Sequence, residues 1–240
     1  MHKTYKSTKL MKQLLIIFFA FCLLTSCNKR VVQLPETTNK DITEVIDVSP
    51  VYMFYDEETD SVEFNRRNII SSTNWLVNID KRLTLKQILP HLQYLQEKRQ
   101  GDGMHKNDKA RNYFTCNNTD LKNLSFIEFT DVVYHEEYSG DYFSKISDIQ
   151  KNEALIIHIN SSGEIGTMII KNDKPSSYTI EKENFLDIIK DLTNENTESI
   201  EILINYDSNL SFQDYIDFKT LLLDLEEDYS LISNHEFIHN

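Results

Sequence analysis

The chain has 240 residues, of which 40% are hydrophobic and 26% are charged, and its formal net charge is −13. A strongly acidic chain repels nucleic-acid phosphates and anionic lipid headgroups, so we expect no nucleic-acid partner. The three cysteines are too few for a disulfide framework, while the length suits two small domains.

Residues 1–26 are predicted to be a secretory signal peptide that is removed. Four lysines precede an apolar run from Leu14 to Leu24, and two small residues, Thr25 and Ser26, follow it. This run is about half of the ~20 residues that a membrane-spanning helix needs, and a basic start before a short apolar run is typical of secretion signals. Loss of the four lysines would change the net charge to −17.

Cys27 follows this segment directly. A small residue and then a cysteine at the end of the apolar run resemble the lipobox of bacterial lipoproteins, in which the cysteine becomes acylated. The resemblance implies a lipid such as palmitate on Cys27, and hence a membrane anchor. The alternative is an ordinary signal peptide with an incidental cysteine. Asn28 follows, not the aspartate that favours the inner membrane in that family, so we expect the periplasmic face of the outer membrane and leave the inner membrane open.

Residues 27–48 are polar and are predicted to be a tether between the lipid and the first domain. From residue 49 onward, alternating apolar residues predict a hairpin formed by Val51–Tyr55 and Val62–Phe64. The same alternation over Trp75–Ile79 predicts a further strand.

A helix is predicted from Leu85 to Leu95, where apolar residues recur at helical spacing after the candidate N-cap Thr84. Pro90 lies inside this pattern, so the helix either bends there or begins there, and we favour the second because proline fits the first helical position. The basic cluster that follows is interpreted as a solvated loop, with an acidic partner as the alternative. Its members are Lys98, Arg99, Lys106, Lys109 and Arg111.

Two segments of the chain match each other without a gap. Asn112–Tyr134 aligns with Glu201–Leu223 at a constant offset of 89 residues, which places Asn118 on Asp207. The match predicts a strand, a turn and a helix in each segment, and hence two copies of one domain. Cys116 lies in the first of these strands and is predicted to be a buried thiol.

The second copy begins with two apolar runs, Ala154–Asn160 and Ile165–Ile170, that flank a turn and predict a hairpin. Further elements are predicted as a helix over Phe185–Leu192, a strand at Ile202–Ile204, a helix over 211–227 and a last strand within Tyr229–Phe237. The expected fold class is therefore α+β. It comprises two tandem β-β-α-β-α(-β) domains, over residues 49–140 and 154–240, with helices on one face of a short sheet.

Two motifs of the second copy carry a family resemblance. The first is a strand, a glycine turn and a strand, Ile157-x-Ile159-x-x-x-Gly163-x-Ile165. The second is an aspartate before a helix, Asp207-x-x-Leu210-x-Phe212-x-x-Tyr215-Ile216-x-Phe218. Together they resemble the periplasmic domain of the ExbD/TolR family of biopolymer transport proteins. The first copy has Asn118 in place of the aspartate.

The resemblance implies a non-enzymatic binding or scaffolding component that is accessory to an energised transport system. Its partner would be an envelope protein or peptidoglycan, with a homodimer as a further option. The resemblance implies Asp207 and Asn118 as binding residues, although for Asp207 we favour a structural role, in which it accepts backbone N–H bonds in its turn and caps the next helix. Family members carry an acidic residue in an N-terminal membrane helix, whereas the signal segment here has none, so we expect no proton-driven motor activity and no cofactor.

The sequence His235-Glu236-Phe237-Ile238-His239 spells HExxH, in which two histidines one helical turn apart bind zinc and the glutamate activates water. A zinc-dependent hydrolase using His235, Glu236 and His239 is therefore the alternative function. The segment alternates as a strand does and ends one residue before the last residue of the chain, so we favour a protein that is not an enzyme.

Overall fold

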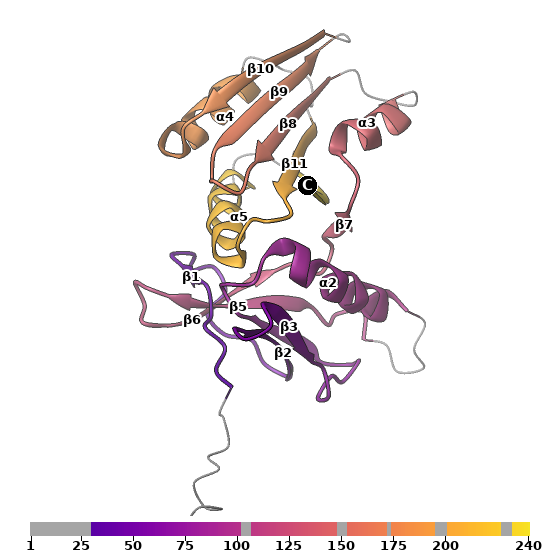
Figure 1. The fold of residues 1–240 in the computed structure, drawn as a ribbon, viewed down its shortest axis with the longest axis vertical. Helices are drawn as coiled ribbons and strands as arrows, with labels where there is room; N and C mark the ends of the chain where they lie inside the picture. The colour runs from indigo at the N-terminus through magenta and orange to yellow at the C-terminus, as the bar shows by residue number, and fades with distance from the viewer. Residues whose placement is uncertain (1–29, 102–106, 148–152, 172–173, 195–200, 227–231) are drawn as a thin grey trace, which may run out of the picture. The chain divides into compact units, whose positions relative to one another are not determined.

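The computed structural model describes residues 30–101, 107–147, 153–171, 174–194, 201–226 and 232–240. Within these residues the fold is mixed α/β, with two six-stranded sheets and four α-helices (Figure 1). None of the described helices is long and apolar enough to cross a membrane. The predicted signal peptide and Cys27 lie outside the described residues.

The N-terminal sheet consists of β1 (Glu36–Thr37), β2 (Val48–Asp56), β3 (Ser61–Asn65), β4 (Asn74–Ile79), β5 (Asn112–Asn118) and β6 (Asn123–Glu128). Its central order is β3-β2-β4-β5, in which β2, β4 and β5 are parallel and β3 forms an antiparallel hairpin with β2. Both β1 and β6 pair with β5. The predicted hairpin and the predicted strand at Trp75–Ile79 are confirmed by β2, β3 and β4.

The C-terminal sheet consists of β7 (Val133–His135), β8 (Glu153–Ile159), β9 (Ile165–Lys171), β10 (Lys174–Ile180), β11 (Glu201–Asp207) and β12 (Ile232–His239). Its order is β10-β9-β8-β11-β12-β7, in which β8, β11, β12 and β7 are parallel and β9 and β10 complete an antiparallel meander. Its helices are α3 (Ser139–Ser147), α4 (Phe185–Asn194) and α5 (Phe212–Glu226).

Opposite faces of the C-terminal sheet have different covers. The inner face carries residues such as Ile157 and Ile204 and packs against α4 and α5 in the main core. The outer face carries Leu203 and Phe237, which pack with Phe143 of α3 in a second, smaller cluster. Figure 1 shows α3 on the other side of this sheet from α4 and α5.

Helix α2 (Leu85–Gln100) begins at the predicted cap. The Thr84 and Gln87 side chains form a capping box, which satisfies backbone N–H groups that the first turn leaves free. The prediction that the helix starts at Pro90 is wrong, because Pro90 lies inside it. Leu85 and Ile88 are fully buried, so the capped and packed first turn is stable although proline removes one helical hydrogen bond.

The aligned segments of the sequence differ in structure. Residues 123–128 form β6, whereas their counterparts at an offset of 89 lie in α5, so the strand predicted at the start of 112–134 is confirmed by β5 but the helix predicted after it is wrong. Leu124 and Phe126 lie on one face of β6 and Ile127 lies on the other, and Phe126 and Ile127 are both buried. Apolar residues on both faces of a short strand imitate helical spacing in sequence.

The structure relates the two halves at a different offset. Asn78, Asp80 and Thr84 occupy the places in the β4–α2 turn that Asn205, Asp207 and Ser211 occupy in the β11–α5 turn, an offset of 127 residues. The side-chain bonds match as well. Asn78 Nδ2 donates to the Val51 carbonyl at 3.0 Å, and Asn205 Nδ2 donates to the Ile157 carbonyl, on the equivalent parallel strand, at 3.5 Å.

Reciprocal backbone hydrogen bonds join the segments that precede α2 and α5. Leu85 N donates to the Leu210 carbonyl at 2.9 Å, and Phe212 N donates to the Leu83 carbonyl at 2.7 Å. Each helix therefore begins on a carbonyl of the other half of the chain, and one hydrophobic core runs through both halves.

Part of the predicted tether is folded against the sheets. Glu36 and Thr37 form β1, and Glu36 N donates to Gln213 Oε1 of α5 at 2.8 Å. The chain is also fixed at Gln33, whose backbone N–H donates to Asp80 Oδ2 at 3.1 Å. The first domain was predicted to end at residue 140. However, β7 and the start of α3, both before residue 140, belong to the C-terminal sheet and its cover.

Arg99 was assigned to the predicted basic loop, but it lies in the last turn of α2 and is buried, with 8% of its surface exposed. Its guanidinium donates to Asn112 Oδ1 at 2.9 Å and to the carbonyls of Ser71 and Thr73 at 2.9 and 3.1 Å. It also stacks 3.7 Å from the centre of the Trp75 ring. Burial, with a smaller effect of nearby Arg111, lowers the pKa of Arg99 to about 10.

Replacing Arg99 should therefore destabilise the N-terminal half. We expect Arg99→Ala to lower the free energy of unfolding by about 3 kcal/mol, because several buried acceptors lose their donors together. Arg99→Lys should recover only part of this, since an ammonium cannot match three acceptors in a plane. Urea unfolding measures both, with the exposed Arg67→Ala as the control that should change little. Equal stability of Arg99→Ala and Arg67→Ala would contradict this role.

Candidate functional site

Strand β12 presents the HExxH residues to two different faces. Successive side chains of a strand point to opposite sides, so Glu236 faces α5 while His235 and His239 face the outer side. Glu236 is only 4% exposed, and its carboxylate bonds to residues of α5. The three residues are therefore not assembled as a zinc-dependent hydrolase requires.

Glu236 is held in a buried polar chain. Its Oε1 atom lies 2.6 Å from Lys219 Nζ, and its Oε2 atom accepts a 2.7 Å hydrogen bond from the Tyr215 hydroxyl. The Tyr215 hydroxyl lies 3.4 Å from that of Tyr134 in β7. Burial, and then the negative charge of Glu236, raises the pKa of both tyrosines well above the usual value, so both remain protonated donors.

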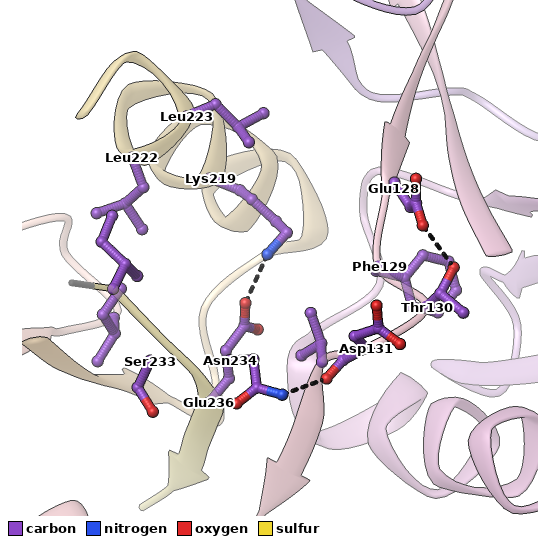
Figure 2. A pocket seen from close by; sticks show the side chains of 13 residues that line it. Glu128, Phe129, Thr130, Asp131, Lys219, Leu222, Leu223, Ser233, Asn234 and Glu236 are labelled. Carbon is purple, nitrogen blue, oxygen red and sulfur yellow. Dashed lines mark hydrogen bonds and ion pairs between the residues drawn. The ribbon is translucent and has the colours of Figure 1, made fainter. Parts of the chain in front are cut away.

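The Lys219–Glu236 pair lies at one side of a cavity of about 240 Å³. Figure 2 shows this pair next to Leu222 and Leu223 of α5 and facing the segment from Glu128 to Asp131. The Asn234 side chain donates to the Asp131 carbonyl at 2.7 Å and ties β12 to that segment. The lining of the cavity thus combines one fixed ion pair with apolar side chains of α5 and with further polar residues, among them Glu128 and Asn234.

The contacts of this pair indicate a structural role. The cavity is smaller than the roughly 300–1,000 Å³ of typical ligand sites. The Lys219 ammonium is committed to Glu236 at close range, so it is not a free nucleophile. The pair also connects α5 to β12 inside the core, so its primary role is structural.

The outer face gathers several aromatic and imidazole side chains. His135 Nε2 lies 2.6 Å from His235 Nδ1, and His235 Nε2 lies 3.3 Å from the Tyr142 hydroxyl of α3. The rings of His135 and Phe237 stack at 4.9 Å. Among the described residues, no group of three or more histidine, cysteine, aspartate or glutamate side chains has the arrangement of a metal site.

Asp207 lies at the carboxyl end of β11, where it stabilises its own turn. Its Oδ1 accepts the Asn209 N–H at 2.8 Å, and its Oδ2 accepts the Ser161 N–H at 3.4 Å. Burial raises its pKa, but hydrogen bonds from Asn209 and Ser161 outweigh that effect and lower it overall. The structural turn role favoured for Asp207 is therefore present, whereas the next helix is capped by Ser211, whose Oγ accepts the Asp214 N–H at 3.1 Å.

Asn118 is fully buried at the end of β5, in the N-terminal sheet. Its Nδ2 donates to the Asn39 carbonyl at 2.7 Å, and its Oδ1 accepts the N–H groups of Asp120 and Leu121. Its polar atoms are thus engaged in structure. The position equivalent to Asp207 is Asp80. Like Asn118, Asp80 is fully buried, and its carboxylate pairs with Arg82 at 2.8 Å.

Cys116 is buried in β5, as the sequence predicts. Burial raises the pKa of its thiol to about 12, so almost none of it is the reactive thiolate at neutral pH. Lys219 was not identified from sequence as a site residue. The signal available was its position one helical turn after Tyr215, but the partner carboxylate lies on another element.

A shallow hollow of about 270 Å³ lies on the outer face over β8, β9 and β10. Gly166 is paired with His158 on one side and Thr179 on the other, so the middle of this row lacks a side chain. A Cβ atom at Gly166 would meet nothing closer than the His158 carbonyl at 4.0 Å. Next to the hollow, Ser176–Thr179 of the edge strand β10 are exposed.

Comparisons with known proteins assign no family. No family model matches the chain, and no curated protein does. A crystal structure described as a conserved Baf family transcriptional activator from Campylobacter jejuni aligns at 11% identity over 80% of this chain and 90% of that chain. Its TM-score of 0.16 is too low to support a common fold.

The Lys219–Glu236 pair predicts a specific pattern of stability. We expect Glu236→Gln and Lys219→Met each to cost about 3–5 kcal/mol, because each leaves one buried charge without its partner. The double variant should cost clearly less than the sum of the two single variants. Chemical denaturation of the four proteins measures this coupling. The exposed pair Lys182–Asp217 supplies the control, since Lys182→Met should cost less than about 1 kcal/mol. Additive losses would show that the two buried groups do not interact.

Proposed function

We propose that this protein is a lipid-anchored, non-enzymatic binding or scaffolding component of the bacterial envelope, accessory to an ExbD/TolR-type transport system. In this proposal the two halves are tandem α+β domains on a lipid at Cys27, on the periplasmic side of the outer membrane. The observation that carries the binding role is the exposed edge of the C-terminal sheet at β10. The ExbD/TolR resemblance supplies the setting, and no cofactor takes part.

Strand β10 has the properties of a strand-accepting edge. It is the last strand of its sheet, and the exposed stretch Ser176–Thr179 carries no charged residue. Edge strands present unpaired N–H and C=O groups, and natural proteins commonly protect them with charges. An extended partner segment that pairs with such an edge gains backbone hydrogen bonds for affinity.

The register identifies which backbone groups face outward. The Thr167 hydroxyl of β9 donates to the Tyr178 carbonyl at 3.3 Å, so that carbonyl faces β9. Backbone groups alternate along a strand, and the N–H and C=O of Ser177 and Thr179 therefore face the open side. Two residues of β10 are thus placed to receive a partner strand.

The hollow over Gly166 offers a place for a partner side chain. It is lined by Ile156, Met168 and Tyr138, with the hydroxyl groups of Ser177 and Thr179 at its rim. No carboxylate or ammonium of the described residues lines it, so it favours an apolar or aromatic side chain. The net charge of −13 favours a partner segment that is uncharged or basic elsewhere.

The anchor is tested by replacing Cys27. We expect Cys27→Ser to abolish incorporation of labelled palmitate and to release the protein from the membrane fraction, because the acceptor thiol is gone. Cys22→Ser, inside the apolar run, is the matched control and should retain both. Metabolic labelling with membrane fractionation measures this, and label that persists in Cys27→Ser would contradict the lipid anchor.

The binding edge is tested by Ser177→Pro, which removes an outward N–H without removing a bond to β9. With a photo-crosslinking residue at position 178, we expect in-cell crosslinking to one envelope protein through an extended segment. Ser177→Pro should reduce the crosslinking yield about tenfold, because proline has no N–H to donate to a partner strand at this edge. Ser177→Ala keeps the N–H and should not reduce the yield. Mass spectrometry identifies the crosslinked segment. Equal yields for the two variants would contradict strand pairing at this edge.

A further inference from the structure

Helix α3 covers only part of the outer face, where Phe143 packs in the smaller core cluster and two polar contacts attach the helix. At its start, Ser139 N donates to Asn205 Oδ1 of β11 at 3.0 Å, and Asn205 Nδ2 donates to Ser139 Oγ at 2.6 Å. Ser139 and Asn205 are both fully buried. One turn later, the Tyr142 hydroxyl reaches His235 of β12.

The second attachment depends on two histidines that contact each other. His135 of β7 and His235 of β12 are joined by a nitrogen–nitrogen distance of 2.6 Å, and their rings stack at 4.9 Å. Tyr142 packs on both rings, with centroid distances of 5.0 Å to each. Both imidazoles therefore lie in the contact between the sheet and α3.

The number of protons on this pair decides whether the contact holds. One neutral imidazole donates its N–H to the other, and a single added proton can still be shared along that bond. With a second proton, both facing nitrogens carry hydrogen and both rings carry positive charge. The short contact is then lost, since two like charges at this distance repel in a half-buried site.

The charged groups around the pair do not remove the limit of one proton on the two histidines. Burial, and then the charge of His235, lowers the pKa of His135, while Glu137 raises it and Lys145 lowers it. Burial lowers the pKa of His235, and Glu201 of β11 raises it. Glu137 is itself paired with Lys145 of α3. Both histidines are therefore poorer bases with α3 in place than they are in water.

We propose that α3 is an acid-released cover of the outer face, held in place while the His135–His235 pair carries at most one proton. Release would expose Phe143 and Phe237 and would move Tyr138, which lines the hollow beside β10. The cover is a property of the fold and does not depend on the binding role of that hollow. It would make the exposed apolar area of this face a function of the surrounding pH.

The sign of the pH dependence follows from linkage. The released state binds more protons than the covered state, so the covered state is favoured above the free histidine pKa of about 6.5 and is lost as the pH falls below it. If release admits one extra proton, the covering equilibrium weakens by up to about 30-fold at a pH about 1.5 units below that value.

Amide hydrogen exchange of the full-length protein at about pH 7.5 and about pH 5 tests this, with labelling times scaled for the intrinsic exchange rate. We expect protection of residues 139–147 to fall by up to about 30-fold at the lower pH, while β11 in the same sample keeps its protection. His235→Gln keeps a hydrogen-bonding side chain that does not titrate, so it should remove most of this response.

His91→Gln is the matched control, because His91 is also half-buried with a pKa lowered by burial, and then by Arg66, but lies on α2. It should leave the response of α3 unchanged. Protection of 139–147 that does not change with pH in the unmodified protein would overturn the proposal. So would a full response in His235→Gln, or in His135→Gln if that first variant does not fold.

Discussion

The fold depends on the reciprocal hydrogen bonds between the starts of α2 and α5. The first N–H groups of any helix have no partner within the helix, and here carbonyls of the opposite half accept one from each, at Leu85 and Phe212. Neither helix start is complete without the other half. A bridge between Thr84 and Ser211 lies at the centre of this exchange, and the common core surrounds it. The two sheets therefore form one cooperative unit, although each has its own strand order.

Local features of the fold were predictable because they depend on neighbouring residues. Thr84 was identified as a cap from its position before a helical pattern, and the β8–β9 hairpin from alternation on both sides of a glycine turn at Gly163. The internal match was less reliable. An offset of 89 aligned apolar spacing and one turn residue, since Asn118 and Asp207 each accept the N–H two residues later, but a strand follows the first turn and a helix follows the second. The offset of 127 aligns Asp80 with Asp207 and also the strand before and the helix after each turn. Apolar spacing and a single turn residue are each shared by many elements, so they did not determine which element follows the turn.

The candidate site was predictable only in part. Strand alternation already indicated that HExxH is not a helical zinc motif, and the structure places Glu236 on the opposite face from both histidines. The partners of Glu236 could not be read from sequence, because Lys219 and Tyr215 come from another element. Arg99 shows the same limit. It looks like one of several solvated basic residues until Trp75 and the carbonyls around it are known.

If Cys27 carries a lipid, as proposed, the folded N-terminal segment would limit how far the body of the protein extends from the membrane. The chain is fixed to the N-terminal half at Gln33, and Thr37 lies 2.9 Å from Thr220 of α5, both through hydroxyl oxygens. Five residues lie between Cys27 and Gln33, and the six steps from one to the other correspond to a reach of at most about 20 Å when fully extended. An acyl chain on Cys27 would therefore hold the body of the protein close to the lipid surface. The anchored protein could then reach partners only within a thin layer next to the lipid. A force on the lipid would act on both halves at once.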